Sequence, residues 1–308
     1  MSSRTSGTAP APTSWWIGSG ASSSSSPEPP PPGRTGRDGF LGLAFELRSG
    51  RTVLIGRRFT LPLQALEPVD LDGTGAATLF LLNPCGGVLG GDRLETRVEL
   101  GAGTRVCLST PSATRVYRSA GLPAVQRTIV RVEEGAAFEY VPDHVIPSPG
   151  ARLIQSVELE LAPGASAILC DAWAAGRAAR GEAWRFDLLD SGTVARDREG
   201  LLFKDRVVLS GARGWGGLGA AEGMPYAATV ACLAPSHGGL DELAAALADA
   251  LAAGAPDASA GVTTLARGGV VVRILAPSAP VLQRAVETSW ATCRTRLWRL
   301  APLALRKM

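Results

Sequence analysis

The chain carries one glycine-rich run suited to close backbone contacts, at residues 81–94. Two Gly-Gly pairs there bracket Val88-Leu89 and end on Asp92, and such glycines first suggest a phosphate-binding loop. A Walker loop, however, needs Lys followed by Ser or Thr after its last glycine, whereas Asp92-Arg93 follows here. A dinucleotide fingerprint needs a helix after the glycines, yet residues 92–100 alternate like a strand. The spacing therefore argues against nucleotide binding.

A carboxylate in a β-rich body usually forms a turn or an ion pair, and three carboxylates in this chain are candidates for more than that. Asp171 follows the apolar strand 167–170, so its charge needs a partner or a hydrated channel. Arg177 or Arg180 would provide the partner. Asp92, directly after two glycines, is typical of a turn, and Asp205 lies between two basic residues, as surface or paired carboxylates do.

Thiols and imidazoles offer little further chemistry. Five cysteines lie far apart and form no CxxC pair, which favours reduced thiols in a cytoplasm and excludes a Cys-only zinc site: Cys85, Cys107, Cys170, Cys232 and Cys293. The two histidines, His144 and His237, leave few general bases. A hydrolase with Ser109, Ser112 or Cys107 as nucleophile stays an alternative, although none of the three stands in a recognised nucleophile elbow.

The composition is that of a globular protein of 308 residues. Hydrophobic residues make up 45%, charged residues 19%, and the net charge is +3. This charge lacks the basic footprint of a nucleic-acid-binding protein. The apolar runs are too short for a membrane helix, and the first 20 residues lack the apolar core of a secretory signal. We therefore expect a cytoplasmic protein that binds neither nucleic acid nor membrane.

The pattern along the chain predicts a mainly β protein in three parts. Residues 1–38 are rich in Ser and Pro and are predicted to be a disordered tail. Residues 39–210 contain short alternating segments closed by Gly, Pro or Asp, which predict a β-rich body. Residues 211–308 predict an α+β subdomain packed on that body, with helices over 240–253 and from about 278 onward.

A weak internal repeat runs through the β-rich part. Asp92, Gln126 and Gln155 each precede a Gly-Ala pair by nine residues, and a strand lies on each side of every pair: Gly101-Ala102, Gly135-Ala136 and Gly164-Ala165. Three stacked strand-turn-strand units indicate a layered, helically wound β-sheet body. Three ordinary hairpins of a β-sandwich would produce the same spacing.

The glycine-rich run resembles the glycine motif of the urease accessory protein UreD (UreH) family. Later segments follow in the order typical of that family and extend the resemblance from Phe40 to about Arg299: residues 110–118, 138–142 with Ile146-Pro147, Asp171 with Gly176-Arg177 and Gly181-Glu182, and 201–206. Two differences are present. Cys85 stands where members usually have proline, and the family's C-terminal Pro-Arg-Ile-Trp is replaced. If that end contacts UreF or urease in other members, the contact must be made differently here.

The resemblance implies a non-enzymatic chaperone, β-rich and helically wound with two helices. Such proteins act with UreF and the GTPase UreG on apo-urease, and nickel is their cargo along an internal polar path, with no permanently bound cofactor. The residues that match this path are Asp92, Asp171 and Asp205, with Thr114 lining it. Oxygen ligands would hold nickel only briefly, because nickel prefers imidazole and thiolate. The alternative is a β-solenoid protein-binding module without a metal role.

Overall fold

The computed structural model describes residues 36–210, 215, 217 and 219–305. Contacts along the chain separate Met1–Pro32 from Gly33–Met308, and the fold below is that of the second unit. The predicted tail 1–38 lies outside the described residues except for its last three. The fold is mainly β, with two α-helices, as the sequence predicts.

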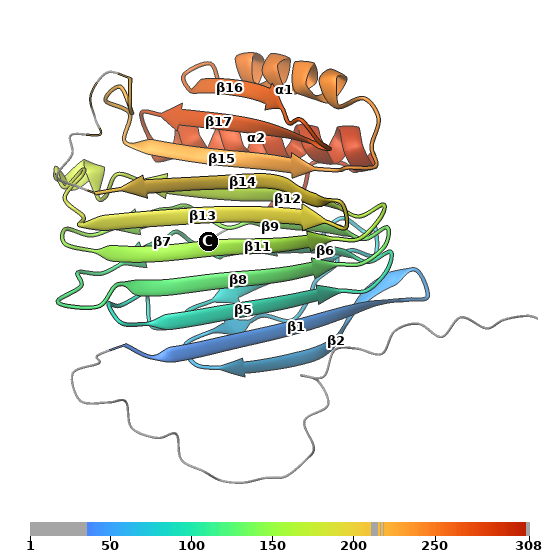
Figure 1. Cartoon of the computed structure of the whole chain (residues 1–308), viewed down its shortest axis with the longest axis horizontal. Coiled ribbons are helices and arrows are strands. Elements are labelled where there is room, and N and C mark those ends of the chain that lie inside the picture. The colour runs from blue at the N-terminus through green and yellow to red at the C-terminus, as the bar shows by residue number, and fades with distance from the viewer. Residues whose placement is uncertain (1–35, 211–214, 216, 218, 306–308) are drawn as a thin grey trace, which may run out of the picture. The chain divides into compact units, whose positions relative to one another are not determined.

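Two sheets face each other and form the body of this unit (Figure 1). The seven-stranded sheet has the order β14 (Gly200–Leu209), β13 (Leu188–Asp197), β11 (Arg152–Leu161), β8 (Ala124–Val132), β5 (Arg93–Leu100), β1 (Asp38–Arg48), β2 (Arg51–Thr60). The ten-stranded sheet has the order β16 (Ser259–Thr264), β17 (Gly269–Ala276), β15 (Tyr226–Leu233), β12 (Ser166–Ala174), β9 (Ala137–Val141), β6 (Arg105–Ser109), β4 (Ala77–Leu82), β3 (Gln64–Ala65). Off this path, β10 (Val145–Pro147) pairs with β12, and β7 (Thr114–Val116) pairs with β10.

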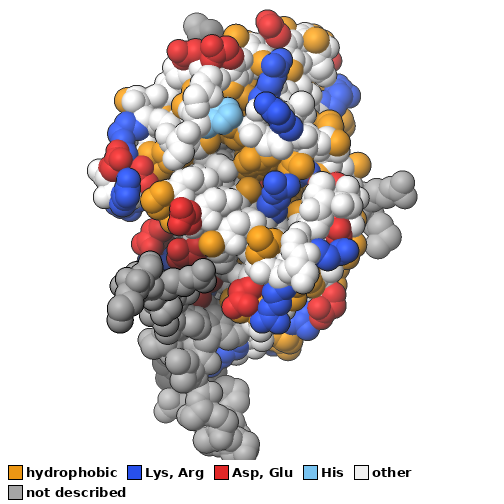
Figure 2. All heavy atoms as spheres, turned by 90° about the vertical axis from the view of Figure 1, so that its right-hand side faces the viewer, with side chains coloured by type: hydrophobic (Ala, Val, Ile, Leu, Met, Phe, Trp, Pro, Cys, Tyr) orange, Lys and Arg blue, Asp and Glu red, His pale blue; other side chains and the backbone are white. Residues whose placement is uncertain are grey.

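The chain winds between the sheets as a solenoid. Each strand-turn-strand unit places its first strand in the seven-stranded sheet and its second strand in the ten-stranded sheet. β5, β8 and β11 pair in parallel in one sheet, and β6, β9 and β12 do so in the other. The three turns are therefore arcs between sheets and not hairpins, which confirms the layered reading. These turns lie at the right-hand end of the body in Figure 1, and Figure 2 shows that basic, acidic and apolar side chains are interspersed on that end.

The register of the paired strands corrects the alignment of the three repeat units that the Gly-Ala spacing predicts. Gln126 pairs with Gln155, as predicted, but the residue beside Gln126 in β5 is Leu94 and not Asp92. The turn glycines with positive φ are Gly103, Gly135 and Gly164, at 68°, 64° and 72°. The first unit contains glycine at both 101 and 103, and the turn uses the second because that position requires the left-handed conformation. The predicted alignment is therefore wrong by two residues in the first unit.

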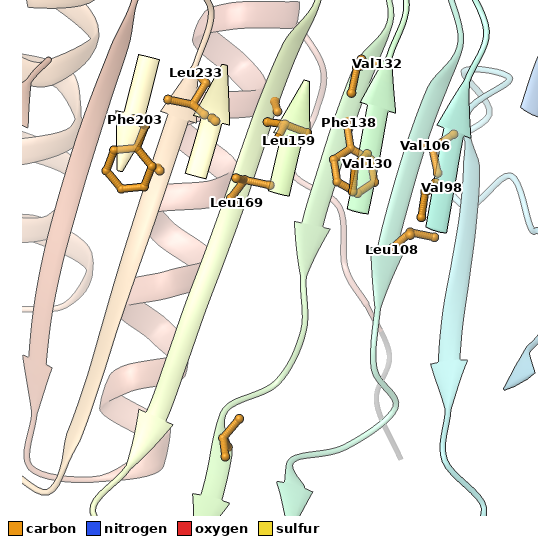
Figure 3. Close-up of a cluster of buried hydrophobic side chains, with 14 of the residues drawn as sticks. Val98, Val106, Leu108, Val130, Val132, Phe138, Leu159, Leu169, Phe203 and Leu233 are labelled. Carbon is orange, nitrogen blue, oxygen red and sulfur yellow. The ribbon is translucent and has the colours of Figure 1, made fainter. Parts of the chain in front are cut away.

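The main hydrophobic core fills the space between the two sheets. Every second residue of β5 is buried, as expected for a strand with one face on a core. Figure 3 shows inward side chains from both sheets: Val98, Val130, Val132, Leu159 and Phe203 from the seven-stranded sheet, and Val106, Leu108, Phe138, Leu169 and Leu233 from the ten-stranded sheet. Fully burying one such side chain contributes about 1.5–3 kcal/mol.

A second core lies on the opposite face of the ten-stranded sheet. Helices α1 (Leu240–Gly254) and α2 (Ala279–Trp298) cover this face and bury a stripe of apolar residues against it (Figure 1). The predicted boundary near residue 210 falls at the end of β14. Beyond it, β15 pairs antiparallel with β12, so the C-terminal strands extend the same sheet. A single 3-10 turn, Ala178–Arg180, follows β12.

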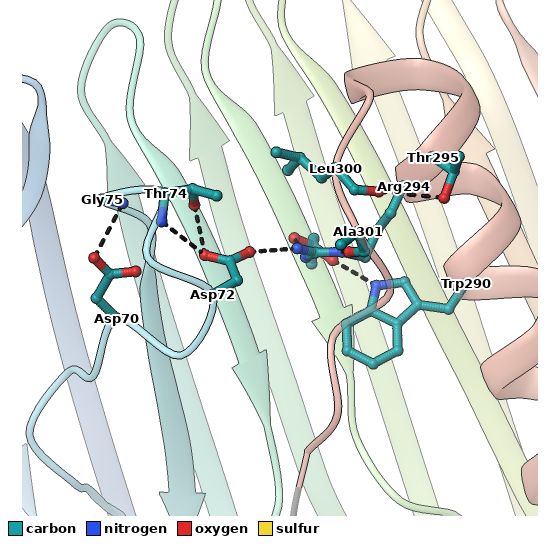
Figure 4. Close-up of polar contacts among 10 residues, drawn as sticks. Asp70, Asp72, Thr74, Gly75, Trp290, Arg294, Thr295, Leu300 and Ala301 are labelled. Carbon is teal, nitrogen blue, oxygen red and sulfur yellow. Dashed lines mark hydrogen bonds and ion pairs between the residues drawn. The ribbon is translucent and has the colours of Figure 1, made fainter.

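A buried guanidinium attaches α2 to two distant segments. Arg294 is 1% exposed; it pairs with Glu139 of β9 through one terminal nitrogen and with Asp72 through the other, at 2.6 Å. Its Nε donates to the Ala301 carbonyl at 3.1 Å, and Trp290 Nε1 donates to Glu139 at 2.5 Å (Figure 4). Burial raises the pKa of Glu139. Burial also acts to raise the pKa of Asp72, but the hydrogen bonds from Thr74 and the charge and hydrogen bond of Arg294 together lower it.

Replacing Arg294 with methionine should destabilise the protein by about 3–5 kcal/mol, because two carboxylates lose their buried counter-ion. Arg284→Met on the same helix is the matched control. Arg284 is 54% exposed and lies 3.9 Å from Asp257, so its loss should change stability by less than about 0.5 kcal/mol. Urea unfolding of both variants measures the difference, and equal losses would contradict the role assigned to Arg294.

Candidate functional site

A belt of polar side chains interrupts the apolar core between the sheets. We name it the polar belt and define it by these residues: Thr128, Tyr140, Gln155, Asp171, Ser191, Asp205, Thr229 and Arg273. Gln155 and Ser191 are neighbours on β11 and β13 of one sheet. Asp171, Thr229 and Arg273 are neighbours on β12, β15 and β17 of the other. Two facing rows of polar residues therefore meet across the sandwich.

Asp171 lies at the centre of the polar belt. Gln155 Nε2 donates to its Oδ1 at 2.9 Å, and the Ser191 hydroxyl donates to its Oδ2 at 2.5 Å. Burial raises the pKa of Asp171; the hydrogen bond from Ser191 opposes that rise, the charge of Asp205 adds to it, and Arg273 and Gln155 oppose it. Because burial dominates, the neutral form is favoured here relative to an exposed carboxyl group.

The predicted arginine partners of Asp171 are wrong. Arg177 instead forms a two-point ion pair with Glu182, at 2.5 and 2.9 Å. Arg180 belongs to an exposed 3-10 turn. The strand β12 ends at Ala174, so both arginines lie beyond the sheet while Asp171 points between the two sheets. Neutral donors, and not a buried arginine, satisfy this carboxyl group.

Asp205 lies where the polar belt meets solvent. Arg273 binds both of its oxygens, at 2.7 Å and 2.8 Å, and also donates to the Thr229 hydroxyl at 2.8 Å. The side chain of Arg273 is 53% exposed and that of Asp205 only 15%. The pair spans the seam between β14 of one sheet and β15 and β17 of the other, so Arg273 closes the open edge of the sandwich.

The structure does not bring Asp92 together with Asp171 and Asp205. Asp92 is 3% exposed, and both of its oxygens accept backbone N–H groups at 2.8 Å, one from Arg37 and one from Leu89. This is the geometry of a carboxylate that closes a turn. In the sheet, β8 separates the strand that follows Asp92 from β11, which carries the Gln155 bound to Asp171.

Thr114 belongs to the same sheet as Asp171. In the sheet it is the neighbour of Val145, which in turn is the neighbour of Trp173. Trp173 is two residues from Asp171 along β12, on the same face. Thr114 is therefore connected to the strand of Asp171 only through these neighbours, and its own N–H donates to the His144 carbonyl at 3.1 Å.

Other candidate residues have structural surroundings. Ser109 is fully buried and donates to the Val141 carbonyl at 2.6 Å, and Cys107 is 2% exposed, so neither thiol nor hydroxyl reaches solvent. Cys85 is exposed. His144 contacts the edge of the Tyr226 ring. Among the described residues, no three His, Cys, Asp or Glu side chains gather in a way that could hold a metal ion.

The sequence analysis missed most of the polar belt. Gln155 was noted only as a marker of the repeat, and Ser191, Thr229 and Arg273 were not singled out. A signal existed in β13, where Leu189, Ser191, Thr193 and Ala195 alternate inward and only the outer two are apolar. Thr229 of β15 and Arg273 of β17 were harder to find, because their partner Asp205 lies on β14 of the other sheet. The sequence does not show that these strands meet.

Comparison with known proteins places the whole described unit in one group. The family model described as UreD urease accessory protein matches residues 37–307. A urease accessory protein UreD from Delftia acidovorans is 34% identical over 289 residues, which cover 85% of this chain and 91% of the relative. Proteins of the same name from Cupriavidus pinatubonensis and Haloarcula marismortui are 35% identical over 260 residues (82% of this chain, 88% of the relative) and 34% identical over 270 residues (86% and 89%). The similarity therefore spans both sheets and both helices.

Valine at Gly90 or Gly91 should lower solubility, because the first position has no room for a side chain and the second has a backbone conformation that favours glycine. Gly91 has φ of 85°, which a β-branched residue strongly disfavours, and a Cβ on Gly90 would lie 2.3 Å from Ser119 Oγ. Gly121→Val is the control, since a Cβ there meets nothing within 4 Å. The soluble fraction and melting temperature of the three variants decide the point; an insoluble Gly121→Val would show that any valine in these loops is harmful.

The raised pKa of Asp171 predicts a pH-dependent effect of Asp171→Asn. A folded-state pKa above the unfolded value adds stability that is lost as pH rises through the folded pKa. Asparagine keeps the shape and avoids the buried charge, and Ser191 can accept where it donated. The melting temperature of Asp171→Asn relative to wild type should therefore increase from about pH 5 to about pH 8. Asp190→Asn, on the outer face of the seven-stranded sheet, should show no such increase, and an equal increase in both variants would contradict the assignment.

Proposed function

The chain belongs to the UreD urease accessory protein family, and we propose that it serves urease maturation as a chaperone that lets nickel pass through the polar belt into apo-urease. The family membership confirms the resemblance seen in the sequence and implies the role in urease maturation. The nickel path is the proposal. The single observation that carries it is the presence of two carboxyl groups, Asp171 and Asp205, with hydroxyl and amide groups beside them between the two sheets, where the core is otherwise apolar.

The chemistry of the polar belt suits a cargo ion in transit. Its donors are carboxylate, hydroxyl and amide oxygens, and nickel binds such ligands less tightly than imidazole or thiolate. Asp171 has two neutral hydrogen-bond partners and no ion pair with an arginine. A divalent cation that approached it would replace a proton as the compensating charge, and no buried ion pair would have to be broken.

The proposed partners are UreF, the GTPase UreG and apo-urease, in the cytoplasm. The chain itself acts without catalysis: purified alone, it is expected to hydrolyse neither urea nor GTP. The residues after α2, where the family ending is replaced, pack Leu303 and Leu305 onto the helical core. In this protein that end therefore contributes to the helical layer, and a partner would meet it as part of that layer. No described helix is long and apolar enough to cross a membrane.

Co-expression with apo-urease, UreF and UreG tests the nickel path. Asp171→Ala should remain folded, because Gln155 Nε2 still donates to the Ser191 hydroxyl, at 2.8 Å in the wild type. It should also join the complex, while the urease produced contains several-fold less nickel and is correspondingly less active. Asp171→Glu, which keeps a carboxylate, should lose less.

The control is Asp190→Ala, which removes a carboxylate from the outer face of the seven-stranded sheet and should leave nickel loading unchanged. Melting temperature, pull-down of the complex and urease nickel content are measured on each variant. A stable, assembled Asp171→Ala that loads urease fully would exclude Asp171 from the path. Insolubility would assign it a structural role instead.

A further inference from the structure

Arg273 occupies the place that a cation would take at the mouth of the polar belt. Its guanidinium binds both oxygens of Asp205 and the hydroxyl of Thr229. Thr229 is also the neighbour of Asp171 on the adjacent strand. The positive charge therefore lies at the solvent end of the row that leads to Asp171, and it contacts the first carboxylate that an entering ion would meet.

The contact is of a kind that opens readily. The Arg273 side chain is 53% exposed while Asp205 is 15% exposed, so the arginine can move into water without unfolding any element. Ion pairs with one well-solvated partner contribute little to stability, because water compensates for their loss. Removal of the arginine would leave Asp205 without this counter-ion, at the end of the row of neighbouring residues Arg273, Thr229 and Asp171.

Uncompensated carboxylates would attract abundant ions as well as nickel. Mg²⁺ and Ca²⁺ prefer carboxylate, hydroxyl and amide oxygens, the only ligands that the polar belt offers. An arginine over the mouth excludes weakly bound ions, because each must first displace it. A cation that binds more strongly, or one delivered by a partner at high local concentration, overcomes the same barrier.

We propose that Arg273 is a displaceable counter-ion that closes the polar belt while it is empty and leaves Asp205 when a nickel ion enters. The inference rests on the proposed nickel path and adds a gate to it. Arg273 acts through Asp205 and is a positioning residue. It also sets selectivity, since it keeps hard divalent ions out of a site made of oxygen ligands.

The outer surface contains a matched control. Arg206 binds Asp190 through two hydrogen bonds, at 2.9 and 2.7 Å, with side chains 62% and 14% exposed. The geometry and exposure resemble those of the Arg273–Asp205 pair, but Asp190 lies on the outer face of β13, away from the polar belt. A change in metal affinity that occurs when Arg273 is replaced, but not when Arg206 is replaced, therefore arises from the polar belt. It cannot be attributed to the loss of a surface arginine in general.

Nickel binding to the purified full chain, measured by calorimetry, tests the gate. Arg273→Gln should bind Ni²⁺ about tenfold more tightly than wild type and should also bind Mg²⁺, because a competing positive charge is gone. Arg206→Gln should change neither affinity. The double variant Arg273→Gln with Asp205→Asn should lose the gain, and Arg273→Lys, which keeps one charge, should fall between wild type and Arg273→Gln.

An Arg273→Gln protein that is folded and binds Ni²⁺ and Mg²⁺ as wild type does would overturn the gate. If that variant is insoluble, Arg273→Lys takes its place, and an unchanged nickel affinity there overturns the gate as well. The two proposals fail separately. The nickel path is decided by urease loading in the complex with Asp171→Ala, whereas the gate is decided on the isolated chain with Arg273 variants.

Discussion

Strands β12 and β15 are buried on both faces, and this constraint organises the rest of the molecule. Seven of the eight residues of β15 are buried, and β12 is buried at all but two positions. One face meets the seven-stranded sheet, and the other requires a second apolar layer, which α1 and α2 provide. A strand of this kind belongs in the middle of a three-layer structure. The two helices are therefore required because the ten-stranded sheet is apolar on both of its faces.

The same constraint explains why the charged groups inside the molecule occur where they do. Arg294 enters the helical layer from α2 and is compensated there by Glu139 and Asp72, which come from segments more than a hundred residues earlier in the chain. Asp171 enters the layer between the sheets and is compensated by neutral donors. The first is a closed ion pair that holds the layers together. The second leaves the carboxyl group of Asp171 without an arginine partner, so a cation can replace its proton. This difference separates the structural ion pairs of Arg294 from the proposed nickel path.

The fold was largely predictable, since alternation and turn glycines are local signals. The parallel winding was supported by the spacing of three turns, but the choice between Gly101 and Gly103 depended on which residue adopts positive φ, and spacing does not report this. The candidate site was less predictable. Asp171 stood out because a carboxylate follows an apolar strand. Arg273 did not, because an arginine in a strand next to the edge strand of a sheet is ordinary until its partner on β14 is known.

By itself the sequence determined the family, the β-rich class, the two helices and the presence of an unusual carboxylate at Asp171. These properties follow from composition, from periods of two and 3.6 residues, and from motif order, all of which are read along the chain. Only the tertiary structure decided that Asp171 faces Gln155 and Ser191 and not an arginine, that the backbone N–H of Arg37 reaches Asp92, and that Arg273 covers Asp205. Each of these contacts joins strands of different sheets or distant loops. Their geometry is set by the stacking of the sheets, which no local pattern encodes.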